Sequence, residues 1–145
     1  MVEVQILGKS YPLCLTVAAL DDINAKCGGL NQIGNFLDGK MPQRMIITDG
    51  EDAAPAAGTM EAMVINTTWL LGVLLREGEN SRLQAARLSG EAAQRRAVPD
   101  SQELAQLLTV ARAMKYRAAV FDAVAESMNR EIEALYPKNK DAEQE

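Results

Sequence analysis

The chain has 145 residues, a formal net charge of −5, 48% hydrophobic residues and only 4% aromatic residues. This length fits one domain with a core of its own, and the composition favours helix because residues with unbranched side chains lose little freedom there. The absence of histidine excludes imidazole catalysis and histidine metal ligands, and the negative charge argues against sequence-independent nucleic-acid binding.

The first fifteen residues predict a β-hairpin. Apolar and polar residues alternate over 2–7 and again over 10–15, as in half-buried strands. The pair Gly8-Lys9 lies between them and suits a two-residue turn with Gly at its first central position. A lone hairpin is marginally stable, so we expect it to pack against helices.

Two short helices are expected to follow the hairpin. Thr16 is the predicted N-cap of the first helix, and Gly28 ends it by taking a left-handed cap. Asn31 is the predicted cap of the second helix, which ends at Gly39. Residues 40–58 are expected to form a mobile loop that includes a short strand at residues 45–47.

A strong helix is predicted from Met60 to Glu77, where apolar residues lie on nearly every side, so this helix should be the buried centre of the domain. Trp69 is assigned to the core. Gly78 is predicted to end the helix, and residues 79–97 are predicted to be helical again, with a division at Gly90.

Asp100 and Glu103 form a predicted capping box at the start of the last helix. Apolar residues then recur at intervals of three and four as far as Leu135, which predicts one helix of about 35 residues and about 50 Å. Such a helix is longer than a domain of this size is wide, so it either bends or packs on another chain at its far end. The polar residues 137–145 are expected to be a frayed tail, after a single domain spanning 1–136.

The apolar stripe of this last helix has two interpretations. For its first half we favour packing in the core of the same chain, and from Ala118 onward core packing and a protein-binding surface are equally favoured. Alanine lets a partner helix approach closely, and methionine adapts to different partners. The candidate protein-binding residues are Met114, Ala118, Phe121, Ala125, Met128 and Ile132.

Other clusters have less specific interpretations. The acidic run at 49–52 lacks the ligand spacing of a calcium loop and is interpreted as a solvated loop. Four arginines at positions 82, 87, 95 and 96 are interpreted as a solvated helix face, with an acidic partner or nucleic acid as the alternative. Cys14 and Cys27 are interpreted as buried apolar residues. No catalytic motif is present, so we predict a protein that is not an enzyme and has no metal or cofactor.

No basic start leads into an apolar run, as a secretory signal would require. The longest uncharged stretch considered, residues 62–75, is shorter than the ~20 residues of a membrane span. We therefore expect a cytoplasmic protein without a membrane partner.

Three segments carry a resemblance to a known family. They are the hairpin with its Gly-Lys-Ser-Tyr-Pro-Leu sequence, residues 16–20 with the Gly28-Gly29 stop, and the segment 68–78. Together they resemble the tail assembly chaperones of long-tailed bacteriophages and related gene-transfer particles. The resemblance covers about 60 residues, and none of its motifs is chemically specific.

The resemblance implies a non-catalytic protein of the bacterial host cytoplasm that covers apolar helical surface of the tape-measure protein during tail assembly. It supplies no catalytic or ligand-binding residue. A homo-oligomer formed through the last helix is a further expectation. The alternatives are a structural tail or head–tail subunit that stays in the particle, and a helical DNA-binding regulator that uses the arginines.

Overall fold

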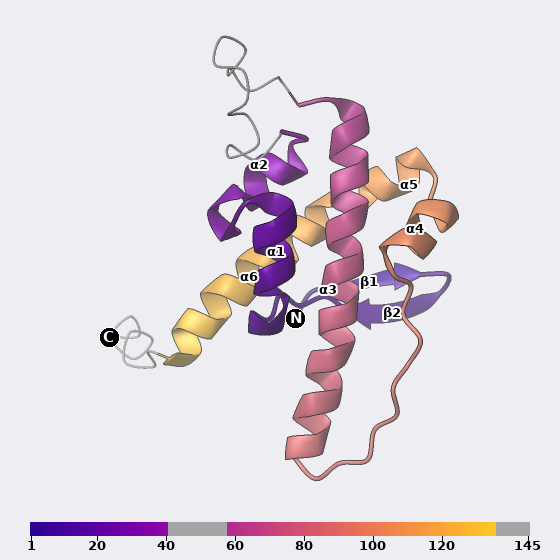
Figure 1. The fold of residues 1–145 in the computed structure, drawn as a ribbon. Helices are drawn as coiled ribbons and strands as arrows, with labels where there is room; N and C mark the ends of the chain where they lie inside the picture. The colour runs from indigo at the N-terminus through magenta and orange to yellow at the C-terminus, as the bar shows by residue number, and fades with distance from the viewer. Residues whose placement is uncertain (41–57, 136–145) are drawn as a thin grey trace, which may run out of the picture.

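The computed structural model describes residues 1–40 and 58–135, with side-chain surroundings as far as residue 129. The fold is mainly α with one small antiparallel hairpin, as the sequence predicted (Figure 1). Helix α3, Met60–Leu88, runs through the whole molecule, and the other elements pack around it. The predicted strand at 45–47, most of the predicted loop 40–58 and the tail 137–145 lie outside the described residues.

Strands β1, Glu3–Ile6, and β2, Lys9–Pro12, form the hairpin, with Ile6 opposite Lys9. The turn lies one residue earlier than predicted, because Leu7 and Gly8 are its two central residues, with φ of 52° and 78°. Positive φ at both central positions is the pattern of a type I′ turn, whose twist matches that of the strands. Leu7 therefore stands exposed at the hairpin tip.

Two short helices follow, each preceded by one 3₁₀ turn. Helix α1 spans Leu20–Cys27 and helix α2 spans Ile33–Leu37. The predicted stop at Gly28 is confirmed, since its φ of 94° places it in the left-handed region. Thr16 precedes the first 3₁₀ turn but does not cap it with its side chain; the hydroxyl donates to Glu77 Oε1 instead.

Helix α3 continues through Gly78, so the predicted stop at this residue is wrong. A Cβ on Gly78 would lie 2.0 Å from the Pro12 carbonyl oxygen. Farther back in the helix, a Cβ on Gly72 would lie 2.2 Å from Ser101 Oγ. Both glycines thus serve close packing, of β2 at one point and of the start of α4 at the other.

The chain leaves α3 at Ser89 and turns at Gly90, which has φ of 76°. Residues 91–100 form no helix, so the helix predicted for 79–97 is correct only as far as Leu88. This extended segment returns along α3 to the start of α4 (Figure 1). It is fastened through Arg96, which contacts the buried carboxylate of Glu79.

The predicted single helix over 101–135 is divided into three helices. They are α4, Ser101–Leu107, α5, Val110–Lys115, and α6, Arg117–Leu135. The capping box of Asp100 and Glu103 is confirmed, with both hydrogen bonds formed at 2.8 and 3.0 Å. The α4–α5 elbow forms because Leu108 is extended, with ψ of 136°, and Thr109 caps α5 by accepting from the Arg112 amide.

The core gathers along one stretch of α3. Its buried side chains pack with those of the hairpin, of α1 and α2, and of one face of α6. The predicted buried centre is thus confirmed. None of the described helices is long and apolar enough to cross a membrane.

Candidate protein-binding surfaces

Helix α6 has an inner face that belongs to the core. Val120, Ala123 and Val124 are buried in the main cluster. Beside them, Ser127 accepts a hydrogen bond from the Leu15 amide at 3.0 Å, which ties the helix to the segment after the hairpin. These contacts leave an adjoining side of α6, called its outer face below, outside the core.

The outer face carries most of the predicted binding residues. Ala118 and Ala125 are exposed, Phe121 is 36% exposed and Met128 is 42% exposed. Met114, in α5, is half-buried. The side chain of Ile132 lies outside the described surroundings. We call Ala118, Phe121, Ala125 and Met128 the outer stripe; it is a contiguous row of apolar side chains left without a covering element among the described residues.

The prediction that the first half of the apolar repeat lies in the core is correct for Leu104 and wrong for Leu107 and Ala111, while Met114 is half-buried. Leu107 is 43% exposed and Ala111 is exposed. The reason is the elbow at Leu108, which interrupts the helical phase, so that Ala113 rather than the predicted residues is buried in α5. The seven-residue repeat continues in the sequence, but the helix is interrupted at Leu108, so the repeat does not stay on one face.

Phe121 is held in place from one side by Arg117. The Arg117 guanidinium lies 4.8 Å from the centre of the Phe121 ring, a cation–π contact. The same guanidinium donates to the Leu37 carbonyl and to Asp38 Oδ1 at 2.5 Å. These contacts join the start of α6 to the end of α2 and leave the rest of the Phe121 ring facing outward.

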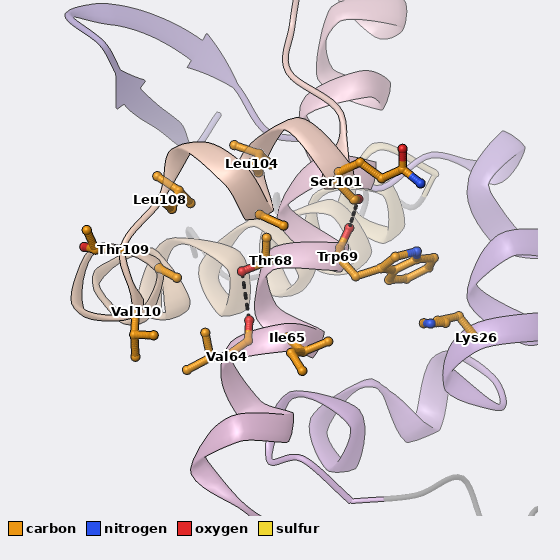
Figure 2. Close-up of a pocket in the computed structure, with 13 residues that line it drawn as sticks. Lys26, Val64, Ile65, Thr68, Trp69, Ser101, Leu104, Leu108, Thr109 and Val110 are labelled. Carbon is orange, nitrogen blue, oxygen red and sulfur yellow. Dashed lines mark hydrogen bonds between the residues drawn. The ribbon is translucent and has the colours of Figure 1, made fainter.

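An apolar groove lies between α3 and the α4–α5 elbow, with a volume of about 310 Å³ (Figure 2). Its floor is formed by Val64, Ile65, Thr68 and Trp69 of α3, and its wall by residues on both sides of the elbow. Sequence reasoning missed this groove because it needs the break at Leu108. The sequence feature that could have indicated this break is Thr109, a good N-cap residue placed inside an otherwise unbroken apolar repeat.

Trp69, assigned to the core from the sequence, is only partly buried and lines this groove. Its ring meets that of Phe36 edge to face, with 5.6 Å between ring centres. Lys26 Nζ lies 5.9 Å from the centre of the Trp69 ring. The ring therefore joins the core on one side to an accessible surface on the other.

Some of the four clustered arginines, at positions 82, 87, 95 and 96, form hydrogen bonds within the fold. Arg82 donates to Glu79 at 2.6 and 3.0 Å, and the Arg96 amide and guanidinium donate to the same carboxylate at 2.6 and 3.2 Å. These hydrogen bonds, those from Arg82 first, lower the pKa of Glu79 from 4.5 to about 2 although burial opposes the shift. Arg95 donates to Asn80. Two of the four arginines thus neutralise a buried acid instead of forming a free basic patch.

The cysteines match their predicted role in part. Cys27 is buried, and burial raises the pKa of its thiol to about 12, so it stays protonated as a small apolar residue. Cys14 is half-buried. The acidic run at 49–52 lies outside the described residues, and the part of the chain that is described holds no group of three or more acidic or cysteine side chains suited to a metal ion.

We compared the chain with known protein families, curated proteins and solved structures. No protein-family model matches the chain, and no curated protein or solved structure is significantly similar to it.

Proposed function

We propose that this protein is a non-catalytic assembly chaperone of a bacteriophage-type tail, which covers apolar helical surface of the tape-measure protein in the bacterial cytoplasm. The observation that carries the proposal is the outer stripe of α6. Its residues recur at the spacing of a helix-pairing seam, and they lie beside the side of the helix that packs in the core and remain exposed.

The chemistry of the stripe suits reversible binding. Phe121 and Met128 offer large, adaptable apolar surfaces, while Ala118 and Ala125 between them leave room for the side chains of a second helix. The inner face of α6 is fixed by Val120 and by the Ser127 hydrogen bond, so the stripe is presented on a rigid element. A partner can therefore bind without rearranging the core.

The test is co-expression with the longest helical protein encoded nearby, followed by size-exclusion chromatography with light scattering. The chaperone proposal expects the long protein to become soluble and to elute with this chain. Phe121→Asp and Met128→Asp should abolish the co-elution, because they place a charge on the stripe. Asn129→Asp is the matched control, since it adds the same charge to an exposed neighbour of Met128 without removing an apolar side chain.

The main rival is a structural tail or head–tail subunit, which would use the same stripe for permanent contacts. Mass spectrometry of purified particles separates the two functions, because a structural subunit stays in the particle and a chaperone does not. Assembly of this chain alone into rings, while the long protein stays insoluble, would overturn the chaperone proposal. Light scattering on the chain alone also measures whether it forms an oligomer through α6.

A further inference from the structure

Three hydroxyl groups that line the groove at the elbow are already hydrogen-bonded within the fold, while the exposed Gln102 amide also belongs to the lining. The Thr68 hydroxyl donates to the Val64 carbonyl at 2.8 Å, and the Ser101 hydroxyl donates to the Trp69 carbonyl at 3.0 Å (Figure 2). Thr109 already accepts the Arg112 amide. The surface that remains is mostly carbon, so the groove selects apolar groups and not a ligand rich in hydrogen bonds.

The rim of the groove is apolar as well. Ile65 of α3 is 56% exposed and Val110, the first residue of α5, is 63% exposed, so these two lining residues reach the edge of the groove. Both residues line the groove and are still more than half exposed, so apolar surface extends from the groove to its edge. A helix that lies across the opening would cover them and would fill the space with two apolar side chains one turn apart.

One charge marks an end of the groove. Lys26 reaches toward Trp69 from α1, across from the elbow (Figure 2). Within residues 1–40 and 58–129, its ammonium group forms no ion pair, whereas the neighbouring Asp22 is paired with Arg76. An apolar groove with a single available cation at its end is complementary to an apolar side chain followed by a carboxylate.

We propose that this groove binds one face of an acidic amphipathic helix from a partner protein. Two apolar side chains at positions i and i+4 enter the groove between Ile65 and Val110, and a carboxylate about one turn farther along pairs with Lys26. The site is separate from the outer stripe of α6 and does not depend on the tail-chaperone function.

The sequence contains a single tryptophan, Trp69, so its fluorescence reports directly on the groove. The probe is a hydrocarbon-stapled, alanine-based helical peptide of about 16 residues, long enough to show several turns. It carries Leu at i and i+4 and Glu at i+8, and it contains no tryptophan. A second peptide has Lys in place of the Glu.

We expect the Glu peptide to cause a saturable change in Trp69 emission and to bind the full chain about threefold more tightly than the Lys peptide, as a partly exposed ion pair allows. Lys26→Glu should reverse this preference. Val110→Glu should weaken both peptides about tenfold, because the charge would be covered on binding. The milder Val110→Ala and Lys26→Gln variants repeat each test if a charged variant does not fold.

Leu88→Glu is the matched control, because Leu88 is 85% exposed at the end of α3, lies outside the groove lining and should leave the Trp69 response unchanged. The proposal is overturned by an absence of any saturable change, by a peptide preference that Lys26→Glu leaves unaltered, or by wild-type affinity in Val110→Glu. It is also overturned if decanoate saturates the site at lower concentration than the peptide, since the occupant would then be an aliphatic acid. Failure of the tape-measure co-expression has no bearing on these readouts.

Discussion

Helices α3 and α6 both carry apolar residues at helical spacing, yet the fold covers them to different extents. Helix α3 is contacted by β2, α2, α4, α5 and α6, and its residues 70–75, more than one full turn, are all buried. Helix α6 packs mainly on α3 and α5 and leaves its outer stripe exposed. The spacing of apolar residues along a helix therefore indicates which residues can be buried. The packing of neighbouring elements against the helix decides which of these residues are buried.

The largest loss of stability is expected if α3 loses its close contact with the hairpin. Gly78→Ala would place a Cβ 2.0 Å from the Pro12 carbonyl oxygen, where the backbone of β2 must move. We expect a loss of about 3 kcal/mol in the free energy of unfolding, despite the better helix propensity of Ala. Urea denaturation followed by circular dichroism measures this loss.

Gly34→Ala is the control for this substitution. Gly34 lies in α2, and a Cβ there would meet nothing within 4 Å. It should be neutral or stabilise by up to about 1 kcal/mol. Equal effects of the two glycine substitutions would contradict the packing role assigned to Gly78.

The two faces of α6 should respond unequally to truncation. Val120→Ala opens a cavity in the core and should cost about 2.5 kcal/mol in unfolding free energy. Met128→Ala, on the outer stripe, should cost less than about 0.5 kcal/mol in the isolated chain. Denaturation midpoints of both variants test the difference, and a large loss at Met128 would mean that the stripe is covered within the chain or by a second copy.

Toward the C-terminal end of α3, the buried carboxylate of Glu79 is paired with two arginines. This pairing makes the free energy of unfolding depend on pH. Because the pKa of Glu79 falls from 4.5 to about 2 on folding, its contribution is present above about pH 4.5 and is lost as the pH falls toward 2. Glu79→Gln should lower the unfolding free energy by about 2 kcal/mol at neutral pH. Thermal melts between about pH 6 and pH 3 should show a shallower decline in this variant than in the wild type; parallel declines would disprove the role of Glu79.

A smaller loss of stability than at Gly78, Val120 or Glu79 is expected at the elbow that turns α5 and α6 away from α4. Thr109→Ala removes the side-chain cap of α5 and should cost about 1 kcal/mol in unfolding free energy. Thr109→Ser keeps an acceptor oxygen and should retain most of that stability. If the two variants prove equally stable, the elbow depends on packing of Leu108 and not on the cap.

Several of the features that the sequence predicted correctly are decided within a few residues. The capping box of Asp100 and Glu103 and the left-handed Gly28 depend only on local backbone requirements. Gly78 was misinterpreted because a glycine that ends a helix and one that admits a neighbouring strand look the same in a sequence. The hairpin was found, but its turn was placed one residue late.

The candidate surfaces could be predicted only in part, for a related reason. The repeat from Ala118 to Met128 marked the outer stripe as apolar, but its exposure depends on how α6 lies against Val120's neighbours in the core. The groove depends on the elbow at Leu108, on α3 and on Lys26 of α1, three segments far apart in the chain. No spacing in the sequence records that they meet.

The hydrogen bond between the Leu15 amide and Ser127 also has a consequence for the order of folding. Its partners are 112 positions apart, whereas the hairpin and the capping box form between near neighbours. Closing so long a loop is slow compared with forming local structure, so α6 should dock after the hairpin and the first helices have assembled on α3. During synthesis, the inner face of α6 is therefore the last part of the core to be covered, and the helix that presents the stripe is set in place at the end.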